Sequence, residues 1–314
     1  MSKRMKKLFF FLGKGGVGKT TLAGSFAAYL SKNFNKVFVA SIDPAHNLFD
    51  FFGITARSGP VEISDNLIAE EIDVDLYLKK FLKEASLKMK KNYHYLQMIN
   101  LENMFDVLKH SPGMEEYAML SALEELIRIW SSQVDYIVID TPPTGLMLKI
   151  FFLPTTTLLW IDKLKKLRKK ILNRRSQLVH IKGKQEFGEN VACDEEEDIV
   201  FKELEIQEKS SKKLLDIFSN HEVCKKILVV NYDELSIREG IKIINELASI
   251  DISVDLMMCN KKGMTDPISP DKEVEKVLDK LKSLKKVEIP FYRDYVTPRN
   301  KMIEIAEIFA KELL

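Results

Sequence analysis

A run of eight residues near the N-terminus has the types and spacing needed to hold phosphate groups. Residues 13–20 read GKGGVGKT and match the pattern G-x-x-x-x-G-K-[ST] at each fixed position. Glycines let the backbone N–H groups of such a loop converge on phosphate oxygens. In this pattern Lys19 reaches the β- and γ-phosphates, and the Thr20 hydroxyl ligates Mg²⁺. The motif therefore predicts a site for ATP and Mg²⁺.

The flanking sequence supplies the elements that such a loop requires. Residues 8–12 form a short apolar run typical of a strand buried on both faces, and the Ala-rich residues 22–29 indicate the helix that follows. The N-terminus of that helix adds a partial positive charge at the loop. The predicted nucleotide-binding residues of this segment are Gly13, Lys14, Gly15, Gly16, Val17, Gly18, Lys19, Thr20 and Thr21.

Two aspartates follow predicted strands, where open α/β sheets place their ligands. Asp43 comes after the strand at residues 37–42, and Asp140 comes after the strand at residues 136–139. Asp43 can orient an attacking water or take part in the Mg²⁺ shell, and Asp140 can accept a hydrogen bond from a Mg²⁺-bound water or from Thr20. Together with Lys19 they predict hydrolysis of ATP by water.

A second lysine, Lys14, follows the first glycine of the loop. This deviant form of the loop resembles that of the dimeric ATPases that include MinD, the nitrogenase iron protein, the arsenite-pump ATPase and the tail-anchored-protein targeting factor. The resemblance implies that Lys14 reaches the nucleotide held by the partner subunit, and hence that the protein is a homodimer with a catalytic role for Lys14.

Two further segments narrow the resemblance to the arsenite-pump and tail-anchored-targeting ATPases. Residues 43–48 (DPAHNL) and 140–145 (DTPPTG) are similar to their switch I and switch II, although Leu146 and Met147 stand where relatives often have His-Thr. The resemblance implies that Asp43 positions the hydrolytic water and that Asn47 makes a polar contact across the dimer. From the residues alone, Asn47 is equally well explained as a helix cap.

The resemblance also covers the C-terminal third of the chain. Asn260, after the predicted strand at residues 253–259, matches an asparagine that reads the adenine edge in that family, and residues 291–294 match a loop that packs its backbone against adenine. The alternative for Asn260 is a turn residue at the end of a strand.

The order of apolar runs and amphipathic stretches predicts an α/β fold, a P-loop NTPase with a mostly parallel, doubly wound sheet. Further strands are expected at residues 66–73, 226–231 and 285–290, and further helices at residues 117–130, 236–247 and 299–314. We expect one domain over residues 1–314, with a helical subdomain built from two insertions at about residues 74–112 and 149–222.

The second insertion contains blocks of opposite charge. Residues 163–184 hold ten Lys or Arg and no acid, and residues 186–208 are mostly acidic. Either two solvated helices pair by charge around a loop at residues 183–193, or a basic face serves an anionic membrane surface or an acidic partner. The basic run lacks interleaved aromatic residues and the net charge is +2, so we expect no nucleic-acid partner.

In the resembled family such insertions form an apolar groove for a client transmembrane helix. The apolar residues that fit a groove, or alternatively plain packing, are Met89, Met98, Met104, Met147, Phe151, Phe152, Leu153 and Trp160.

The cysteines and the lengths of the apolar runs indicate the cellular compartment. Cys193, Cys224 and Cys259 form no C-x-x-C, which predicts a reducing compartment and argues against a zinc bridge or a clustered-thiol metalloid site. We find no run of about 18 apolar residues, so we expect a cytoplasmic protein without a transmembrane segment.

The sequence therefore predicts a switch ATPase that captures and releases a hydrophobic client such as a tail-anchored membrane protein. An energising subunit of an anion or metalloid pump, and a nucleotide-gated scaffold that binds a partner, are the alternatives.

Overall fold

The structure is a computed structural model, which describes residues 7–33, 35–45, 47–55, 58–92, 111–183, 192–264, 281, 284–292 and 299–314. Its centre is a sheet in the order β3-β4-β2-β5-β1-β6-β7-β8. Neighbouring strands pair in parallel except β3 with β4. The strands are β1 (Lys7–Leu12), β2 (Val37–Ser41), β3 (Val61–Ser64), β4 (Leu67–Glu71), β5 (Tyr136–Asp140), β6 (Cys224–Asn231), β7 (Leu256–Lys262) and β8 (Lys286–Pro290). The mostly parallel α/β fold is thus confirmed.

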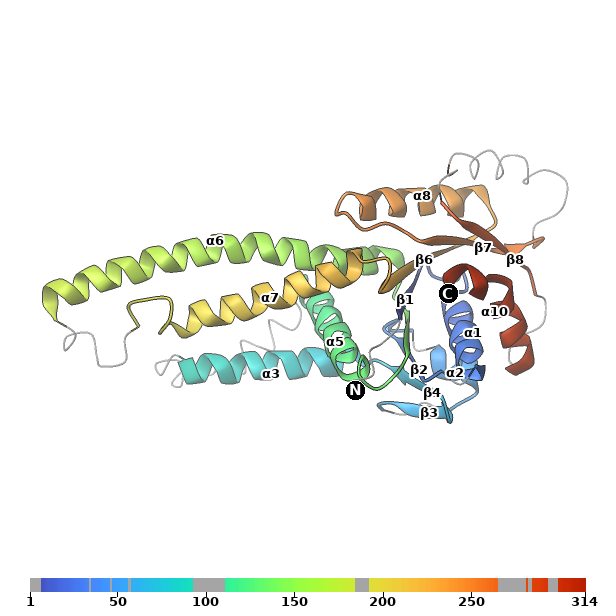
Figure 1. Ribbon diagram of the computed structural model, residues 1–314, viewed down its shortest axis with the longest axis horizontal. Coiled ribbons are helices and arrows are strands. Elements are labelled where there is room, and N and C mark those ends of the chain that lie inside the picture. The colour runs from blue at the N-terminus through green and yellow to red at the C-terminus, as the bar shows by residue number, and fades with distance from the viewer. Residues whose placement is uncertain are drawn as a thin grey trace.

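Helices cover both faces of this sheet (Figure 1). Those described are α1 (Lys19–Lys32), α2 (Leu48–Phe52), α3 (Val74–Asn92), α5 (Met114–Trp130), α6 (Thr144–Lys182), α7 (Ile199–Ser219), α8 (Glu234–Ala248) and α10 (Arg299–Leu313). One apolar layer joins the sheet to α1, α2 and α10, and the other joins it to α5, α8, the start of α6 and the end of α7.

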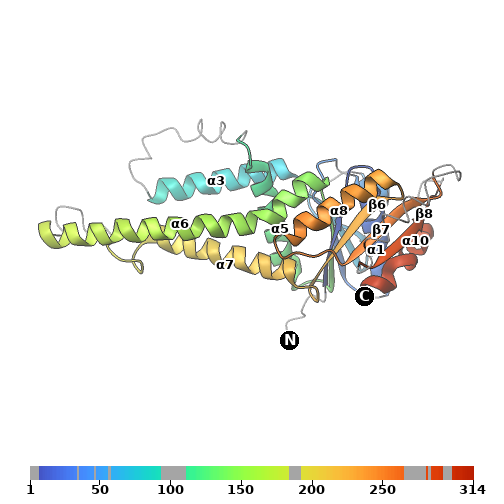
Figure 2. The ribbon, with the colours of Figure 1, turned by 90° about the horizontal axis from the view of Figure 1, so that it is seen from above.

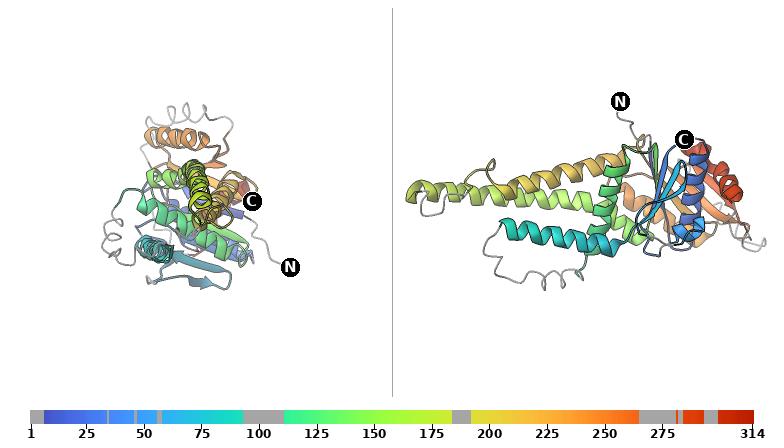
Figure 3. Two further views of the ribbon diagram at one scale, coloured as in Figure 1. Left: turned by 90° about the vertical axis from the view of Figure 1, so that its left-hand side faces the viewer. Right: turned by 90° about the horizontal axis from the view of Figure 1, so that it is seen from below.

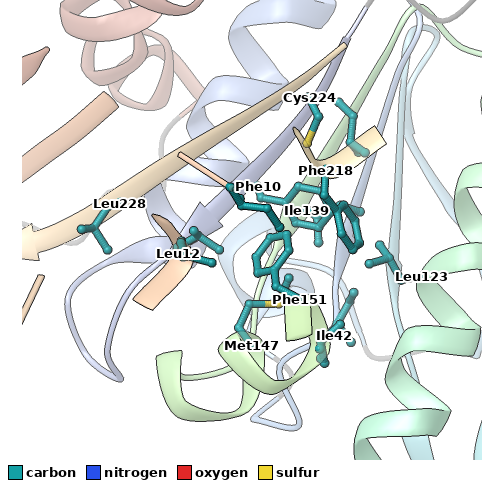
Figure 4. Packing of buried hydrophobic residues seen from close by; sticks show 14 of the residues in the cluster. Phe10, Leu12, Ile42, Leu123, Ile139, Met147, Phe151, Phe218, Cys224 and Leu228 are labelled. Atoms are coloured by element: carbon teal, nitrogen blue, oxygen red, sulfur yellow. The ribbon is translucent and has the colours of Figure 1, made fainter. Parts of the chain in front are cut away.

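The side chains of β1 explain why it lies at the centre. Its phenylalanines are fully buried and alternate between the two layers, because successive side chains of a strand point to opposite faces. Phe10 packs edge-on against Phe151 of α6 and Phe218 of α7, as Figure 4 shows, while Phe9 packs against Phe26 of α1. The apolar run predicted as a strand buried on both faces is confirmed.

Three helices form an arm that projects from the sheet. In Figures 1 and 2, α3, α6 and α7 extend together away from the strands, and α6 reaches farthest. α6 and α7 pair through ions: Lys165 Nζ lies 2.9 Å from Glu208 Oε2, and Arg168 Nη2 lies 2.7 Å from Asp198 Oδ2. The predicted pairing of the basic and acidic segments is therefore confirmed, whereas the assignment of the whole chain to one domain stays a prediction.

Several predicted boundaries are wrong, each for a local reason. The strand predicted at residues 66–73 is confirmed as β4, but its antiparallel neighbour β3 was not predicted, because β3 is half-buried and has no strong apolar pattern. Gly145, at the end of the segment similar to switch II, lies in the first turn of α6, which begins directly after Pro143. β7 begins at Leu256 and continues through Asn260 to Lys262, because the ladder to β8 continues to a pair between Lys262 and Pro290.

The list of possible groove residues also needs correction. Met147 and Phe151 are buried in the core beside the sheet, so they do not line a groove. Phe152 and Leu153 are half-buried, and Trp160 is 63% exposed. The Met89 side chain and the residues Met98 and Met104 lie outside the part of the chain that the structure describes.

The expectation that no segment has the composition of a membrane span must be qualified. In the described part of the chain, residues 144–181 of α6 are long and apolar enough for one, by length and composition alone. A third of the qualifying window is buried inside the fold, whereas the core helix of a soluble protein is mostly buried.

Asp198 ties the arm together, and we expect its loss to weaken the fold. Its side chain is buried, pairs with Arg168 and accepts a hydrogen bond from the Phe201 N–H at the start of α7. Asp198→Ala should reduce the free energy of unfolding by about 3 kcal/mol, because it removes the carboxylate that pairs with the largely buried Arg168 guanidinium. Urea unfolding at pH 7 measures this.

The exposed pair of Lys166 and Asp162 on α6 provides the control, and Asp162→Ala should change the free energy of unfolding by less than about 0.5 kcal/mol. Burial disfavours the charged form of Asp198, but the hydrogen bonds from Arg168 and from the Phe201 N–H, together with the charges of Arg168 and Arg175, outweigh it and lower the pKa of the carboxyl. The stability it provides is therefore present above pH 4 and is lost as the pH falls further. Equal stability of wild type and Asp198→Ala at pH 7 would contradict this account.

Candidate functional site

The loop between β1 and α1 packs so closely against neighbouring residues that only glycine fits at two of its positions. A Cβ on Gly13 would lie 2.3 Å from the Val229 carbonyl oxygen, and a Cβ on Gly18 would lie 2.5 Å from Asn260 Nδ2. Both have positive φ angles, of 149° and 97°. Because only glycine combines these dihedrals with these contacts, the loop can follow this path and open its N–H groups toward the start of α1.

Lys19 begins α1 and lies almost entirely within the fold. It is 5% exposed, and its Nζ donates a hydrogen bond to the Lys14 carbonyl oxygen at 2.9 Å across the loop. Burial lowers its pKa, and the nearby charges of Asp140 and Asp43 oppose that shift. The ammonium is thus held at the mouth of the loop, where it can move to an anionic ligand.

Asp140 is buried beside the first turn of α1. Its Oδ2 accepts hydrogen bonds from Thr20 Oγ1 at 2.7 Å and from Ser41 Oγ at 3.0 Å. Its Oδ1 is buried and has no hydrogen-bond partner among the described residues. Burial raises the pKa of this carboxyl to about 6, against the opposing effect of Thr20, Lys19 and Ser41.

Ser41 is a site residue that sequence reasoning missed. It ends β2 as Asp140 ends β5, and the parallel register places the two residues side by side. The sequence held no signal for it, because the contact depends on the register between β2 and β5.

These groups border a cavity of about 640 Å³ at the carboxyl ends of the strands. Its lining includes Gly15, Gly16, Gly18, Lys19, Thr20, Thr21, Asp43, Asn47 and Asn260, all predicted from sequence. Gly13, Lys14, Val17 and Asp140 were predicted too, but they lie around the cavity rather than in its lining. Pro143, in the segment predicted to be similar to switch II, also lines it. The lining residues that the sequence analysis missed include Asp50, Phe51, Lys261, Ile289 and Ile305.

One side of the cavity comes from the end of β7. Asn260 Nδ2 donates to the Val17 carbonyl oxygen at 2.8 Å, and Lys261 Nζ donates to the Gly16 carbonyl oxygen at 2.6 Å. Lys261 has a φ of 62°, uncommon for a residue other than glycine. Both side chains therefore fasten the glycine loop. Lys261 directly follows Asn260 in the sequence, but it belongs to no recognisable motif and so was not predicted as a site residue.

The adjoining lining comes from the loop after β8. Phe291 and Tyr292 lie there, as expected for that loop, while Arg293 and Asp294 fall outside the described residues.

Lys14 points away from the cavity of its own chain. Its Nζ lies 2.6 Å from Oε1 of Glu239 on α8, and its side chain is 56% exposed. The lysine is therefore available to a ligand outside this chain once it leaves Glu239.

The residues after β2 are less constrained. Asp43 is half-buried and its Oδ1 accepts a hydrogen bond from the Ala45 N–H at 3.0 Å. Asn47 is exposed and precedes α2, but its side chain makes no capping hydrogen bond, so the cap interpretation is wrong for the side chain.

The residues present fit a magnesium-bound nucleoside triphosphate. The start of α1 and the glycine loop suit the phosphates, and the buried Asp140 Oδ1 lacks a donor that a metal-bound water supplies. In the described part of the chain, no three His, Cys, Asp or Glu side chains gather to hold an ion. Mg²⁺ retains several waters and takes phosphate oxygens, so the Thr20 hydroxyl with water-mediated contacts to Asp140 would be enough to hold it.

Comparisons with known proteins agree with this geometry. A family model described as anion-transporting ATPase matches residues 6–309. A putative arsenical pump-driving ATPase 2 of Aquifex aeolicus is 29% identical over 96% of this chain and 98% of its own length. The ATPase get3 of Schizosaccharomyces pombe is 30% identical over 81% of this chain and 73% of its own length.

Other relatives are longer than this chain. A putative arsenical pump-driving ATPase of Chlorobaculum tepidum is 31% identical, and the alignment spans 81% of this chain but only 61% of that protein. The family model nevertheless covers nearly the whole chain, including the glycine loop, both aspartates and Asn260. The chain therefore belongs to the anion-transporting ATPase family, and it is a nucleotide-binding enzyme that hydrolyses ATP.

Proposed function

We propose that this ATPase works as a cytoplasmic homodimer that couples the binding and hydrolysis of Mg-ATP to the capture and release of a hydrophobic client protein. The observation that carries the proposal is the path of α6. This helix begins directly after Pro143, which lines the nucleotide cavity, and runs without a break to Lys182 at the far end of the arm. A shift at the cavity can therefore be passed along α6 to the exposed apolar side chains of the arm.

Each site residue has a role in this proposal. The loop N–H groups, Lys19 and Thr21 hold the phosphates. Asp43 orients the water that attacks the γ-phosphate, and Lys14 completes the partner's site. Thr20 would ligate Mg²⁺, Asp43 would take part in its shell and Asp140 would accept a hydrogen bond from a metal-bound water. The ion would neutralise phosphate charge. Asn47 contacts the second subunit, and Asn260 reads the adenine after exchanging its bond to the Val17 carbonyl.

The names of relatives supply further support. Get3 of Schizosaccharomyces pombe is an ATPase, and the resemblance of residues 43–48 and 140–145 to tail-anchored-targeting ATPases extends to this chain's switch segments. A tail-anchored membrane protein is therefore the client class that we propose.

Light scattering tests the proposal. The protein is measured with and without ATP and Mg²⁺, each with and without a model transmembrane peptide. We expect the mass of a dimer or larger assembly only with ATP and Mg²⁺, and we expect the peptide to elute with it. A dimer that never retains the peptide would agree with an ATP-dependent dimer but would contradict the proposed hydrophobic client.

One alternative function, in a pump, is supported by the names of two relatives. Two relatives carry names of arsenical pump-driving ATPases, which favours an energising subunit of a pump. In that case ATP turnover should rise with the pumped anion or with a membrane partner, rather than with a hydrophobic peptide. Cys224 and Cys259 are buried on different strands and Cys193 lies on the arm, so a metalloid site of clustered thiols is not part of this alternative.

A further inference from the structure

Three polar side chains form a chain of hydrogen bonds near the starts of β6 and β7, and we call them the Ser253 triad. Ser253 Oγ lies 2.8 Å from His221 Nε2, and His221 Nδ1 lies 2.8 Å from Asp255 Oδ1. A hydroxyl, an imidazole and a carboxylate in this order are the groups of a Ser-His-Asp triad. The nucleotide cavity lies at the other, carboxyl ends of the strands, so the Ser253 triad is a separate place on the molecule.

The segment between α8 and β7 presents Ser253 and Asp255 on one side. Ile252 and Val254 are buried and alternate with them, as side chains do in an extended chain. Residues two apart then point the same way, so the hydroxyl and the carboxylate can both meet one imidazole. Asp255 is also anchored through its backbone, because its N–H donates a hydrogen bond to the Lys226 carbonyl oxygen at 2.9 Å.

The turn between α7 and β6 brings the imidazole to this segment. The right-hand view in Figure 3 shows α7 running back along α6 to the sheet, where β6 begins. The Asn220 carbonyl oxygen accepts hydrogen bonds from the Val223 and Cys224 N–H groups. Asn220 Oδ1 accepts another from the Glu222 N–H, which fixes the turn around His221. Because β6 and β7 are paired in parallel, the turns that precede them lie side by side.

Two lysines hold the Asp255 carboxylate. The Lys226 N–H donates to Oδ2 at 2.8 Å, and the fully buried Lys226 Nζ lies 3.5 Å from the same oxygen. Lys225 Nζ lies 3.4 Å from Oδ1. An ionised carboxylate paired with ammonium groups only accepts hydrogen bonds, so we assign the shared proton to His221 Nδ1. The lone pair of His221 Nε2 is then directed to the Ser253 hydroxyl and can take its proton.

The two groups that would react are open to solvent. The His221 side chain is 47% exposed, and Ser253 is exposed as well. Among the residues that the structure describes, the N–H groups of Ser253 and Val254 donate no hydrogen bond. In serine hydrolases the N–H of the nucleophile, or of the residue after it, stabilises the oxyanion. Since Asp255 already has its lysine donors, the need to satisfy a buried carboxylate does not explain the histidine and the serine.

We propose that the Ser253 triad hydrolyses short-chain carboxylic esters. Ser253 Oγ attacks the ester carbonyl carbon as its proton passes to His221 Nε2, and Asp255 stabilises the imidazolium. The bond to the alcohol oxygen then breaks, and His221 returns the proton to the departing alcohol. Water attacks the acyl group on Ser253 by the same route and releases the carboxylic acid.

This activity lies beyond ATP hydrolysis and the proposed client, and it needs neither of them. An exposed hydroxyl suits a short acyl group, because such a group requires few contacts with the protein.

The test uses the full-length protein, p-nitrophenyl acetate as the ester and a fluorophosphonate as a covalent probe. We expect release of p-nitrophenol over many turnovers, and mass spectrometry should place the phosphonate on Ser253. Ser253→Ala should remove this label, and His221→Gln should slow the labelling about 100-fold because the general base is lost.

Matched variants separate the triad from general surface reactivity. Ser249→Ala removes another exposed hydroxyl at the end of α8, and His180→Gln removes an exposed imidazole on α6. Neither should change the labelling of Ser253 or the release of p-nitrophenol. The variants at Ser253 and His221 should unfold within about 2 °C of the wild type, since changes of exposed side chains alter stability little.

Three outcomes would overturn the proposal. Absence of the phosphonate from Ser253 would leave the three hydrogen bonds as a tie between two turns. Equal labelling rates in His221→Gln and the wild type would show that the imidazole does not activate the hydroxyl. Ester hydrolysis that survives Ser253→Ala would assign the reaction to other surface side chains.

Discussion

Lys14→Ala is expected to lower ATP turnover by roughly 10²- to 10³-fold while leaving the dissociation constant for ATP within about threefold of the wild type. In a single chain Lys14 lies outside the cavity lining, and its Nζ contacts Glu239 rather than the loop interior. Its carbonyl oxygen, which accepts the Lys19 hydrogen bond, remains in the alanine variant. Binding should therefore persist, whereas the positive charge that we propose to reach the partner's phosphates is lost.

Turnover is measured by phosphate release and binding by calorimetry on the same preparations. Glu239→Gln is the matched control, because it removes the partner of Lys14 on α8 but keeps the lysine, and it should retain turnover and ATP-dependent dimerisation. Unchanged turnover in Lys14→Ala would exclude a composite site. Loss of ATP binding would instead place Lys14 in the site of its own chain.

The nucleotide site could be predicted from sequence because local motifs and strand ends define it. Gly13, Gly18 and Lys19 belong to one contiguous loop, and Asp43 and Asp140 each follow an apolar run. Parallel pairing then brings the strand ends together without further information. The sequence could not reveal that Ser41 shares the Asp140 carboxylate, because the contact depends on the register between β2 and β5.

The arm was harder to predict for a physical reason. Met147, Phe151 and Trp160 all lie on α6 and are all large and apolar, yet the first two are buried against the sheet and the third is exposed. Periodicity shows that an apolar stripe exists, but it does not show whether the sheet, α7 or solvent lies beside it. The pairing of α6 with α7 was predictable because opposite charge is visible in sequence, as with Lys165 and Glu208.

Asp140→Asn is expected to make the protein without nucleotide more stable, even though it removes a carboxylate that we place in the site. The folded pKa of about 6 lies above the unfolded value of about 3.9, so the folded state binds the proton more tightly. Stability is therefore lost as the pH rises from 4 to 6, and at pH 7.5 the ionised carboxylate costs about 3 kcal/mol.

An amide at this position still accepts the hydrogen bonds from Thr20 and Ser41, but its N–H group replaces the buried Oδ1 and costs about 1 kcal/mol without an acceptor. The free energy of unfolding at pH 7.5, measured with urea, should therefore rise by about 2 kcal/mol in Asp140→Asn. In this variant it should no longer fall between pH 4 and 6.

Ser41→Ala is the matched control for this prediction. It removes a hydrogen bond that lowers the pKa of Asp140, so it should reduce stability and move the pH-dependent decline to higher pH. Turnover of Asp140→Asn should fall by roughly 10²-fold, since the amide cannot match the charge that a metal-bound water requires. A variant less stable than wild type at pH 7.5, with the same pH dependence, would show that the buried carboxylate carries no such cost. A gain in stability together with a loss of turnover would mean that Asp140 keeps an unfavourable charge because ATP hydrolysis needs it.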